Sequence, residues 1–353
     1  MFDFLTKGKG LIGIDISNFT VKLMEFSKNG NNYKIEHFGI LPLEEGMVVN
    51  SKIVKIEEVA DKIRDLVSKY GASTKQAAFA ISGSDAITKI AQFSSLASDE
   101  EILNLIQTYP DQYLPFPIED MAIDFKVLGP SSVSPDLSDV IITGAKITDI
   151  STIVETAQQA GLTPAVIDVS TYAIENIYPL VNENFPDYGR NKAIALIDIG
   201  GINTNATIFD NGDITFARVA NFGGKKLTDE IMSKYGVSYN DAGRLKREGG
   251  LPDNYETELL NPFKEDIVNQ INRLLRFYYN NNHVETVDFI ALAGGCSNID
   301  GISELVESRL GIHCNVLDPF SGMSCAFRVS KKQLQLNSSS LLVAGSLAMR
   351  AFK

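Results

Sequence analysis

The chain has 353 residues, of which 44% are hydrophobic, and this is enough for about two domains or lobes with sizeable cores. It carries 44 acidic and 32 basic side chains, a net charge of −12, which excludes a basic footprint for nucleic acid as the main partner. Three scattered cysteines and three histidines exclude a disulfide framework, a zinc site and a histidine-based triad. No run approaches the ~18 apolar residues of a spanning helix, and residues 1–5 are too short for an anchor. The composition therefore predicts a cytoplasmic globular protein without direct membrane insertion.

The first predicted elements are strands and one amphipathic helix. They comprise strands 11–16, 20–26 and 33–43, a helix over 56–70, and a buried strand over 77–81. Asn29 and Gly30 predict a tight turn between the second and third strands, because both residues tolerate positive φ. Apolar residues recur every three or four positions in the helix, and Gly71 is a natural residue to end it.

The same order of elements recurs in the second half of the chain. It comprises strands 193–199, 205–209 and 213–221, a helix from 225 to 236, and a strand over 288–293. Asp15 and Asp198 each end the first strand of their block, and an Asn-Gly turn follows 14 residues later at Asn29 and 13 residues later at Asn211. This pattern predicts an internal duplication into two similar halves.

Residues 92–163 between the two blocks have a different character. Ser98 and Glu101 predict a capping box for a helix. The segment 113–117 contains two prolines and fits neither a helix nor a central strand. Strand-like runs at 122–128 and 140–145 and a helix over 148–160 complete a small α+β insertion. Later in the chain, Pro262 favours the start of a long helix, and a last helix is expected over 341–352.

Three strand-end segments have the composition of nucleotide-binding turns. They are 13–18 together with Lys22, 198–204, and 293–298. Turns rich in Gly, Ser and Asn let backbone N–H groups approach phosphate closely, and a strand-end carboxylate can hold Mg²⁺ through water. The P-loop motif and the dinucleotide-binding glycine motif are both absent. The three segments together therefore predict a different kind of nucleotide site, located between the two halves.

These segments resemble the phosphate-1, phosphate-2 and adenosine motifs of the actin, heat-shock chaperone and sugar-kinase superfamily. Within it, essentially the whole chain resembles the PilM family of FtsA-like proteins of the type IV pilus assembly platform. The stretches that carry the resemblance are GIDISNFTVKLMEF, DQYLPFPIEDMAIDFKV, FGGKKLTDEI, AGRLKREGGLPDNY, PFKEDIVNQINRLLRFYY, LAGGCSNIDG and GSLAMRAF. The resemblance implies an α/β fold of the actin-like ATPase type, built from duplicated RNase H-like domains with an FtsA-type 1C insertion.

The resemblance also implies a division into subdomains. Subdomain 1A would comprise 1–91, 164–190 and 325–353, subdomain 1C would comprise 92–163, subdomain 2A would comprise 191–238 and 285–324, and subdomain 2B would comprise 239–284.

The implied ligands are ATP and Mg²⁺ in the central cleft. The phosphates and the metal would face Asp15, Ser17, Asn18 and Lys22 from one lobe and Asp198, Gly200, Gly201, Asn203 and Thr204 from the other. The adenosine would lie against Gly294, Gly295 and Ser297, with Lys246 near the ribose or adenine. Asp15 and Asp198 would hold Mg²⁺ through water.

The candidates for a catalytic role are Asp15, Asp198 and Ser170. Ser170 stands where many relatives carry a glutamate that orients the attacking water. A serine can hold a water but cannot act as a carboxylate base. Binding of ATP is therefore expected, whereas hydrolysis is expected to be slow or absent.

The resemblance implies an ATP-binding cytoplasmic scaffold of the type IV pilus machine. It would bind the N-terminal cytoplasmic tail of PilN, lie at the inner membrane through PilN, and connect indirectly to PilO, PilP and the pilus motor and platform proteins. Tyr113, Leu114 and Phe116 of the insertion are the candidate walls of a groove for this extended peptide. Two alternatives stay open: an actin-like protein that assembles into homo-oligomeric filaments, and a small-molecule kinase of the same superfamily, for which no sugar-binding motif is found.

Overall fold

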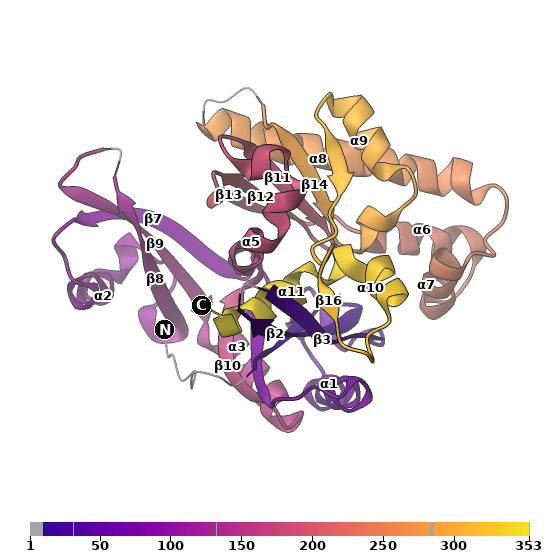
Figure 1. The fold of residues 1–353 in the computed structure, drawn as a ribbon, viewed down its shortest axis with the longest axis horizontal. Coiled ribbons are helices and arrows are strands. Elements are labelled where there is room, and N and C mark those ends of the chain that lie inside the picture. The colour runs from indigo at the N-terminus through magenta and orange to yellow at the C-terminus, as the bar shows by residue number, and fades with distance from the viewer. Residues whose placement is uncertain (1–9, 31, 132, 283–285, 353) are drawn as a thin grey trace.

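Two mixed β-sheets with the same strand order form the two lobes of this computed structural model, which describes residues 10–30, 32–131, 133–282 and 286–352 (Figure 1). The expectation for residues 1–5 lies outside this part of the chain. The order is β10-β6-β1-β2-β3-β16 in the first sheet and β13-β12-β11-β14-β15 in the second. In each sheet the first strand pairs antiparallel with the second, and it pairs parallel with β6 in the first lobe and with β14 in the second. The predicted duplication is confirmed.

The first lobe contains the six-stranded sheet and the helices packed on it. Its elements are β1 (Ile12–Ile16), β2 (Thr20–Asn29), β3 (Asn32–Pro42), β4 (Val48–Val49), β5 (Lys52–Ile53), α1 (Ile56–Tyr70), β6 (Gln76–Ile81), α3 (Ile147–Gln159), β10 (Thr163–Val169), α4 (Ser170–Ala173), β16 (Ser324–Cys325), α10 (Lys331–Asn337) and α11 (Leu342–Ala348). Gly71 ends α1 with a left-handed φ of 74°, and its N–H donates to the carbonyl of Val67, as the sequence predicts.

The second lobe repeats this arrangement and carries one longer helix, α8. Its elements are α5 (Tyr178–Val181), β11 (Ala193–Ile199), β12 (Thr204–Asp210), β13 (Asp213–Ala220), α6 (Lys225–Tyr235), α7 (Tyr239–Glu248), α8 (Asn261–Asn282), β14 (Phe289–Ala293), α9 (Ile302–Leu310) and β15 (Cys314–Val316). Asn211 and Gly212 have φ of 52° and 95°, the left-handed turn expected between β12 and β13. A π-helical turn, Glu256–Leu260, precedes α8, which begins one residue before Pro262.

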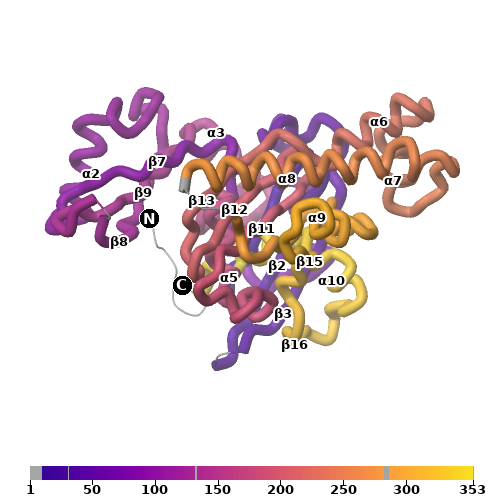
Figure 2. Tube along the Cα trace, turned by 90° about the horizontal axis from the view of Figure 1, so that it is seen from above, coloured from indigo at the N-terminus to yellow at the C-terminus, as the bar shows by residue number. Residues whose placement is uncertain are grey.

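The insertion is a separate three-stranded sheet, ordered β7-β9-β8, that extends to one side of the lobes (Figures 1 and 2). Its elements are β7 (Ala86–Ser94), α2 (Asp99–Thr108), β8 (Met121–Pro130) and β9 (Leu137–Lys146). The capping box of Ser98 and Glu101 at α2 is confirmed. The sequence analysis missed β7, which begins before residue 92, the expected start of the insertion. The helix that was predicted to close the insertion is α3, and it buries Ala157 in the core of the first lobe. We propose 86–146 as the bounds of the inserted subdomain.

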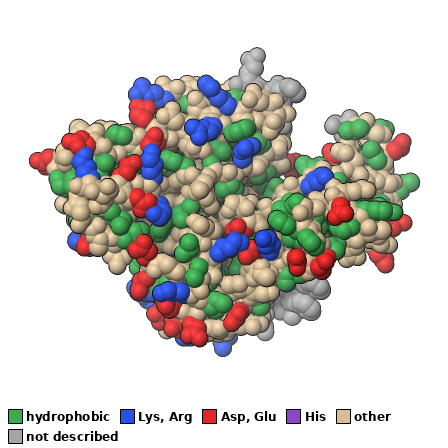
Figure 3. Space-filling model, turned by 180° about the vertical axis from the view of Figure 1, so that it is seen from behind, with side chains coloured by type: hydrophobic (Ala, Val, Ile, Leu, Met, Phe, Trp, Pro, Cys, Tyr) green, Lys and Arg blue, Asp and Glu red, His purple; other side chains and the backbone are tan. Residues whose placement is uncertain are grey.

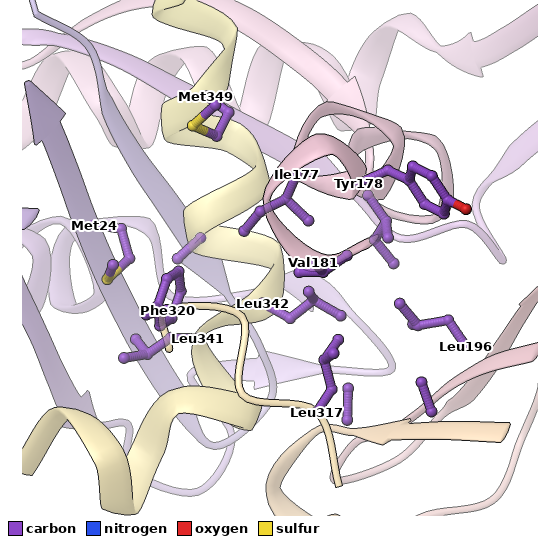
Figure 4. Packing of buried hydrophobic residues seen from close by; sticks show 14 of the residues in the cluster. Met24, Ile177, Tyr178, Val181, Leu196, Leu317, Phe320, Leu341, Leu342 and Met349 are labelled. Carbon is purple, nitrogen blue, oxygen red and sulfur yellow. The ribbon is translucent and has the colours of Figure 1, made fainter. Parts of the chain in front are cut away.

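The two lobes share one hydrophobic core at the hinge between them (Figure 4). Met24 from β2 and Leu196 from β11 belong to the same cluster of buried residues as Ile177, Phe320 and Leu342. The last predicted helix is shorter than expected: α11 spans Leu342–Ala348, and 3₁₀ turns flank it on both sides. This short helix lies directly on β1 and joins the lobes.

The surface drawn in Figure 3 intersperses acidic, basic and hydrophobic side chains. Many charged groups form exposed pairs, such as Lys225 with Asp229 at 2.6 Å. Among the described residues, no helix is long and apolar enough to cross a membrane.

Candidate functional site

A cleft with a volume of about 1120 Å³ lies between the two lobes. The turns after β1, β11 and β14 all line it, together with α7 and the start of α4. The duplicated topology explains the convergence, because the strand-end turn of each half comes to the same edge of its sheet. Of the predicted site residues, the cleft is lined by Asp15, Ser17, Asn18, Lys22, Ser170, Asp198, Gly200, Gly201, Asn203, Lys246, Gly294 and Gly295.

Asp15 and Lys22 form a charged pair where the first lobe lines the cleft. They are direct partners in the antiparallel register of β1 and β2, and Lys22 Nζ lies 2.8 Å from Asp15 Oδ2. Burial opposes the charge of Lys22, but the carboxylates of Asp15 and Asp198 outweigh it and raise the lysine pKa. Lys22 therefore carries a positive charge inside the cleft.

Asp198 occupies the equivalent place in the second lobe. Its register partner in β12 is Asn205, whose amide donates to Asp198 Oδ2 at 3.3 Å. Burial raises the pKa of Asp198, Lys22 opposes that rise, and Asp15 adds to it. Seven residues separate carboxylate and partner in both halves, but the second half replaces lysine by asparagine, so two carboxylates share one cation.

The backbone around the second turn is packed too tightly for side chains. A Cβ built on Gly223 would lie 2.6 Å from the carbonyl oxygens of Gly200 and Gly201, and one on Gly294 would lie 2.4 Å from Asp198 Oδ1. Gly294 also has a φ of 86°. Within the described residues, the N–H groups of Gly201 and Ile202 donate to no protein acceptor. The turn therefore offers free backbone donors beside a buried carboxylate.

Three predicted polar side chains already have protein partners. The hydroxyl of Ser17 accepts from the N–H of Thr20 at 3.1 Å and shapes the turn after β1. The amide of Asn18 bonds the backbone of Val48 and Ser51, which holds the β4–β5 hairpin. Asn203 Nδ2 lies 3.5 Å from Ser51 Oγ, across the cleft. In this conformation these side chains organise the loops that line the cleft.

Thr204 and Ser297 do not line the cleft, which differs from the sequence-based expectation. Both are buried, and their hydroxyls donate to main-chain carbonyls, Thr204 to Phe222 at 2.8 Å and Ser297 to Gly294 at 2.8 Å. A buried hydroxyl needs a hydrogen-bond partner, and the neighbouring turn supplies one. These two residues support the turns from behind.

Lys246 reaches the cleft from α7 and is held by the start of α6. Its ammonium donates to Thr228 Oγ1 at 2.7 Å and to the carbonyl of Gly224 at 3.2 Å. Burial lowers the pKa of Lys246. The neighbouring thiol of Cys296 has its pKa raised to about 11, chiefly by burial, so it stays protonated. The lysine therefore places its amino group on this wall of the cleft, beside Arg247 of the same helix.

Ser170 lies at the start of α4, where its hydroxyl accepts from the N–H of Gly83 at 3.2 Å. Asp168, two residues earlier, is turned away from the cleft and lies 3.3 Å from Arg350 Nε. The two side chains differ because β10 ends at Val169 and Ser170 already belongs to α4, so strand alternation does not extend to Ser170. Asp168 therefore does not supply the carboxylate that Ser170 lacks.

The sequence missed several residues that line the cleft. They include Phe19, Lys52, Asp85, Asp149, Tyr239 and Arg247. Lys52 pairs with Asp149 at 2.5 Å and Asp85 at 3.5 Å, which joins β5, the turn after β6 and α3. Such pairs unite segments distant in the chain, so no local pattern marks them. Phe19 did carry a signal, because a large aromatic residue interrupts an otherwise small and polar turn.

The candidate groove residues of the insertion divide into two kinds. Tyr113 stacks on Phe93 with ring centroids 5.6 Å apart and packs against the insertion's own core. Leu114 is 5% exposed and lies close to Gly144 of β9. The Leu114 side chain is therefore not available as an exposed groove wall. Phe116 is 42% exposed, and Lys146 Nζ lies 4.9 Å from its ring centroid.

The donor set in the cleft suits a hydrated magnesium ion. Among the described residues, no three acidic, cysteine or histidine side chains gather as a complete metal site. Asp15 and Asp198 provide two carboxylates with a single lysine between them, and Mg²⁺ characteristically keeps several waters and takes one or two carboxylates plus phosphate oxygens. These residues fit Mg²⁺ that arrives with a nucleotide.

The comparisons with solved structures show the fold. The PilM-PilN type IV pilus biogenesis complex matches with a TM-score of 0.84 and 23% identity, over 98% of this chain and 99% of that one. The ethanolamine utilization protein EutJ from Carboxydothermus hydrogenoformans matches with a TM-score of 0.56 and 14% identity, over 98% and 90%. The expected α/β actin-like fold is confirmed.

The sequence comparisons identify the family. The cell division protein FtsA of Bacillus subtilis is 25% identical over 205 residues, which is 58% of this chain but only 44% of that protein's length. A family model described as type IV pilus assembly protein PilM matches residues 13–352. Since this match covers nearly the whole chain, the chain belongs to the PilM family of type IV pilus assembly proteins.

Proposed function

We propose that this protein is an ATP-binding cytoplasmic scaffold of the type IV pilus assembly machine. The observation that supports nucleotide binding is the pair of strand-end carboxylates, the partly buried Asp15 and the buried Asp198, which share Lys22 beside a turn with free N–H groups. Bound Mg²⁺ would offset the charge of the phosphates at these carboxylates. Calorimetric titration with Mg-ATP tests the proposal, and an absence of binding would overturn it.

The proposed partner is the N-terminal cytoplasmic tail of PilN, bound as an extended peptide beside the insertion. Support comes from the family and from the resemblance to a structure described as a PilM-PilN complex. On this protein, the exposed apolar side chain that we propose contacts the peptide is Phe116. Through PilN, the protein would lie at the inner membrane and connect indirectly to PilO, PilP and the motor and platform proteins.

A synthetic PilN tail peptide is expected to bind with a Kd of about 1 μM or tighter, or about 8 kcal/mol, by fluorescence anisotropy. Replacing residues 87–144 by a short flexible linker should abolish binding. Ala86 and Ala145 pair directly across the sheet, so the linker joins neighbouring strand ends and leaves α3 in the first lobe.

Point variants refine this test. Phe116→Ala should weaken binding of the peptide. Leu96 belongs to the same subdomain and is 92% exposed, and Leu96→Ala should leave peptide binding unchanged. The deletion variant should still bind Mg-ATP, which shows that both lobes are folded. If it also binds the peptide with wild-type affinity, the groove lies elsewhere.

Turnover of ATP is expected to be far below one per second, because Ser170 stands in place of a carboxylate and general-base assistance is worth roughly 10²–10⁴-fold. Ser170→Glu should raise the rate of phosphate release, since Ser170 already lines the cleft. Ser170→Ala is the matched control and should leave the slow rate unchanged. A wild-type rate of several per second would contradict this expectation.

A further inference from the structure

Phe19 bridges the two lobes at the phosphate end of the cleft. It belongs to the turn between β1 and β2, and its backbone carbonyl is fixed by the N–H of Leu43 at 2.9 Å. A Cβ built on Gly201 would lie 2.2 Å from two ring carbons of Phe19. The ring therefore packs directly on the second lobe's turn, against the residue whose N–H group has no protein acceptor among the described residues.

A second contact extends this bridge. The Phe19 ring stacks on Tyr239, with centroids 6.0 Å apart and planes inclined by 29°. Tyr239 is the first residue of α7, so the stack joins the first lobe to a helix of the second. Burial, followed by the charge of Glu45, raises the pKa of Tyr239 to about 12. Asn203 and Ser51 meet across the same gap at 3.5 Å.

We propose that Phe19 is a gate of the nucleotide cleft, which an incoming triphosphate must displace from Gly201. The inference rests on the proposed nucleotide site and adds its regulation. A phosphate that accepts from the N–H groups of Gly201 and Ile202 needs the space over this turn, and the aromatic ring lies there. Displacement breaks the Phe19–Tyr239 stack, so nucleotide binding is coupled to separation of the lobes at this edge.

The affinity for Mg-ATP, measured by calorimetry, tests the gate. Phe19→Ala should bind about threefold to tenfold more tightly than the wild type, the change that matches the loss of one aromatic pair. Phe19→Leu, which keeps an apolar side chain, should give a smaller gain. Phe327→Ala is the matched control, because Phe327 is fully exposed and should leave the Kd unchanged.

A spectroscopic reporter tests the displacement itself. The chain contains no tryptophan, so Phe19→Trp introduces a single indole at the gate. Its emission should shift to longer wavelength on addition of Mg-ATP, as the ring leaves Gly201 and meets water. An emission that stays constant while calorimetry detects binding would overturn the gate.

The outcomes separate the gate from the proposed function. If the wild type binds Mg-ATP and Phe19→Ala binds equally or more weakly, the gate is wrong and the nucleotide site stands. If neither protein binds Mg-ATP, the proposed nucleotide function is overturned and the gate with it.

Discussion

Mg-ATP at about one hundred times its Kd is expected to stabilise the folded protein by about 2.7 kcal/mol, because a ligand that binds only the folded state shifts the unfolding equilibrium by mass action. The melting temperature, measured by calorimetry with and without Mg-ATP, should rise accordingly. Asp198→Asn should remove most of this rise, and Asp15→Ala should reduce it, since each variant removes one of the carboxylates beside Lys22. An unchanged melting temperature in the wild type would contradict the prediction.

The same Asp198→Asn variant gives a pH signature in the absence of nucleotide. Burial raises the pKa of Asp198 in the folded state, so its protonation favours folding, and its contribution to stability falls as the pH rises through the raised pKa. The asparagine does not titrate. The variant should therefore gain stability relative to the wild type as the pH rises over that range. A constant difference would show that Asp198 is not the titrating group.

Gly13→Ala is expected to destabilise the protein by at least about 3 kcal/mol, at the upper end of the cost of overpacking a core. A Cβ on Gly13 would lie 2.0 Å from the carbonyl oxygen of Ala344 and 2.6 Å from the backbone N of Ala348. Both obstacles are backbone atoms of α11, so β1 and this helix must move apart and the hinge core with them. The urea midpoint of unfolding measures the loss.

Gly295→Ala is the matched control for this prediction, because a Cβ there would meet no atom within 4 Å. It should shift the midpoint by no more than about 0.5 kcal/mol, as for a surface substitution. A Gly13→Ala variant of equal stability would mean that β1 and α11 are not in close contact.

Local patterns in the sequence located most strands and helices, because each half repeats short apolar strands and Asn-Gly turns that act over a few residues. The spacing of seven residues from Asp15 to Lys22 already places them opposite each other in a two-stranded hairpin. Strand β7 was missed because its own residues carry little local pattern. It is an edge strand with exposed residues such as Ile90, and it is defined by its partner β9 and by little in its own pattern.

The sequence by itself determined the duplication, the family and the turns that meet at the cleft. Tertiary structure alone decided which side chains are available there. Thr204 and Ser297 have the polarity expected of ligand-binding residues, yet both donate to carbonyls of neighbouring turns behind the cleft. Phe19 lacks that polarity, yet it covers Gly201, 182 positions later in the chain. A residue type states which bonds a side chain can form, but its partner is fixed only when the lobes pack.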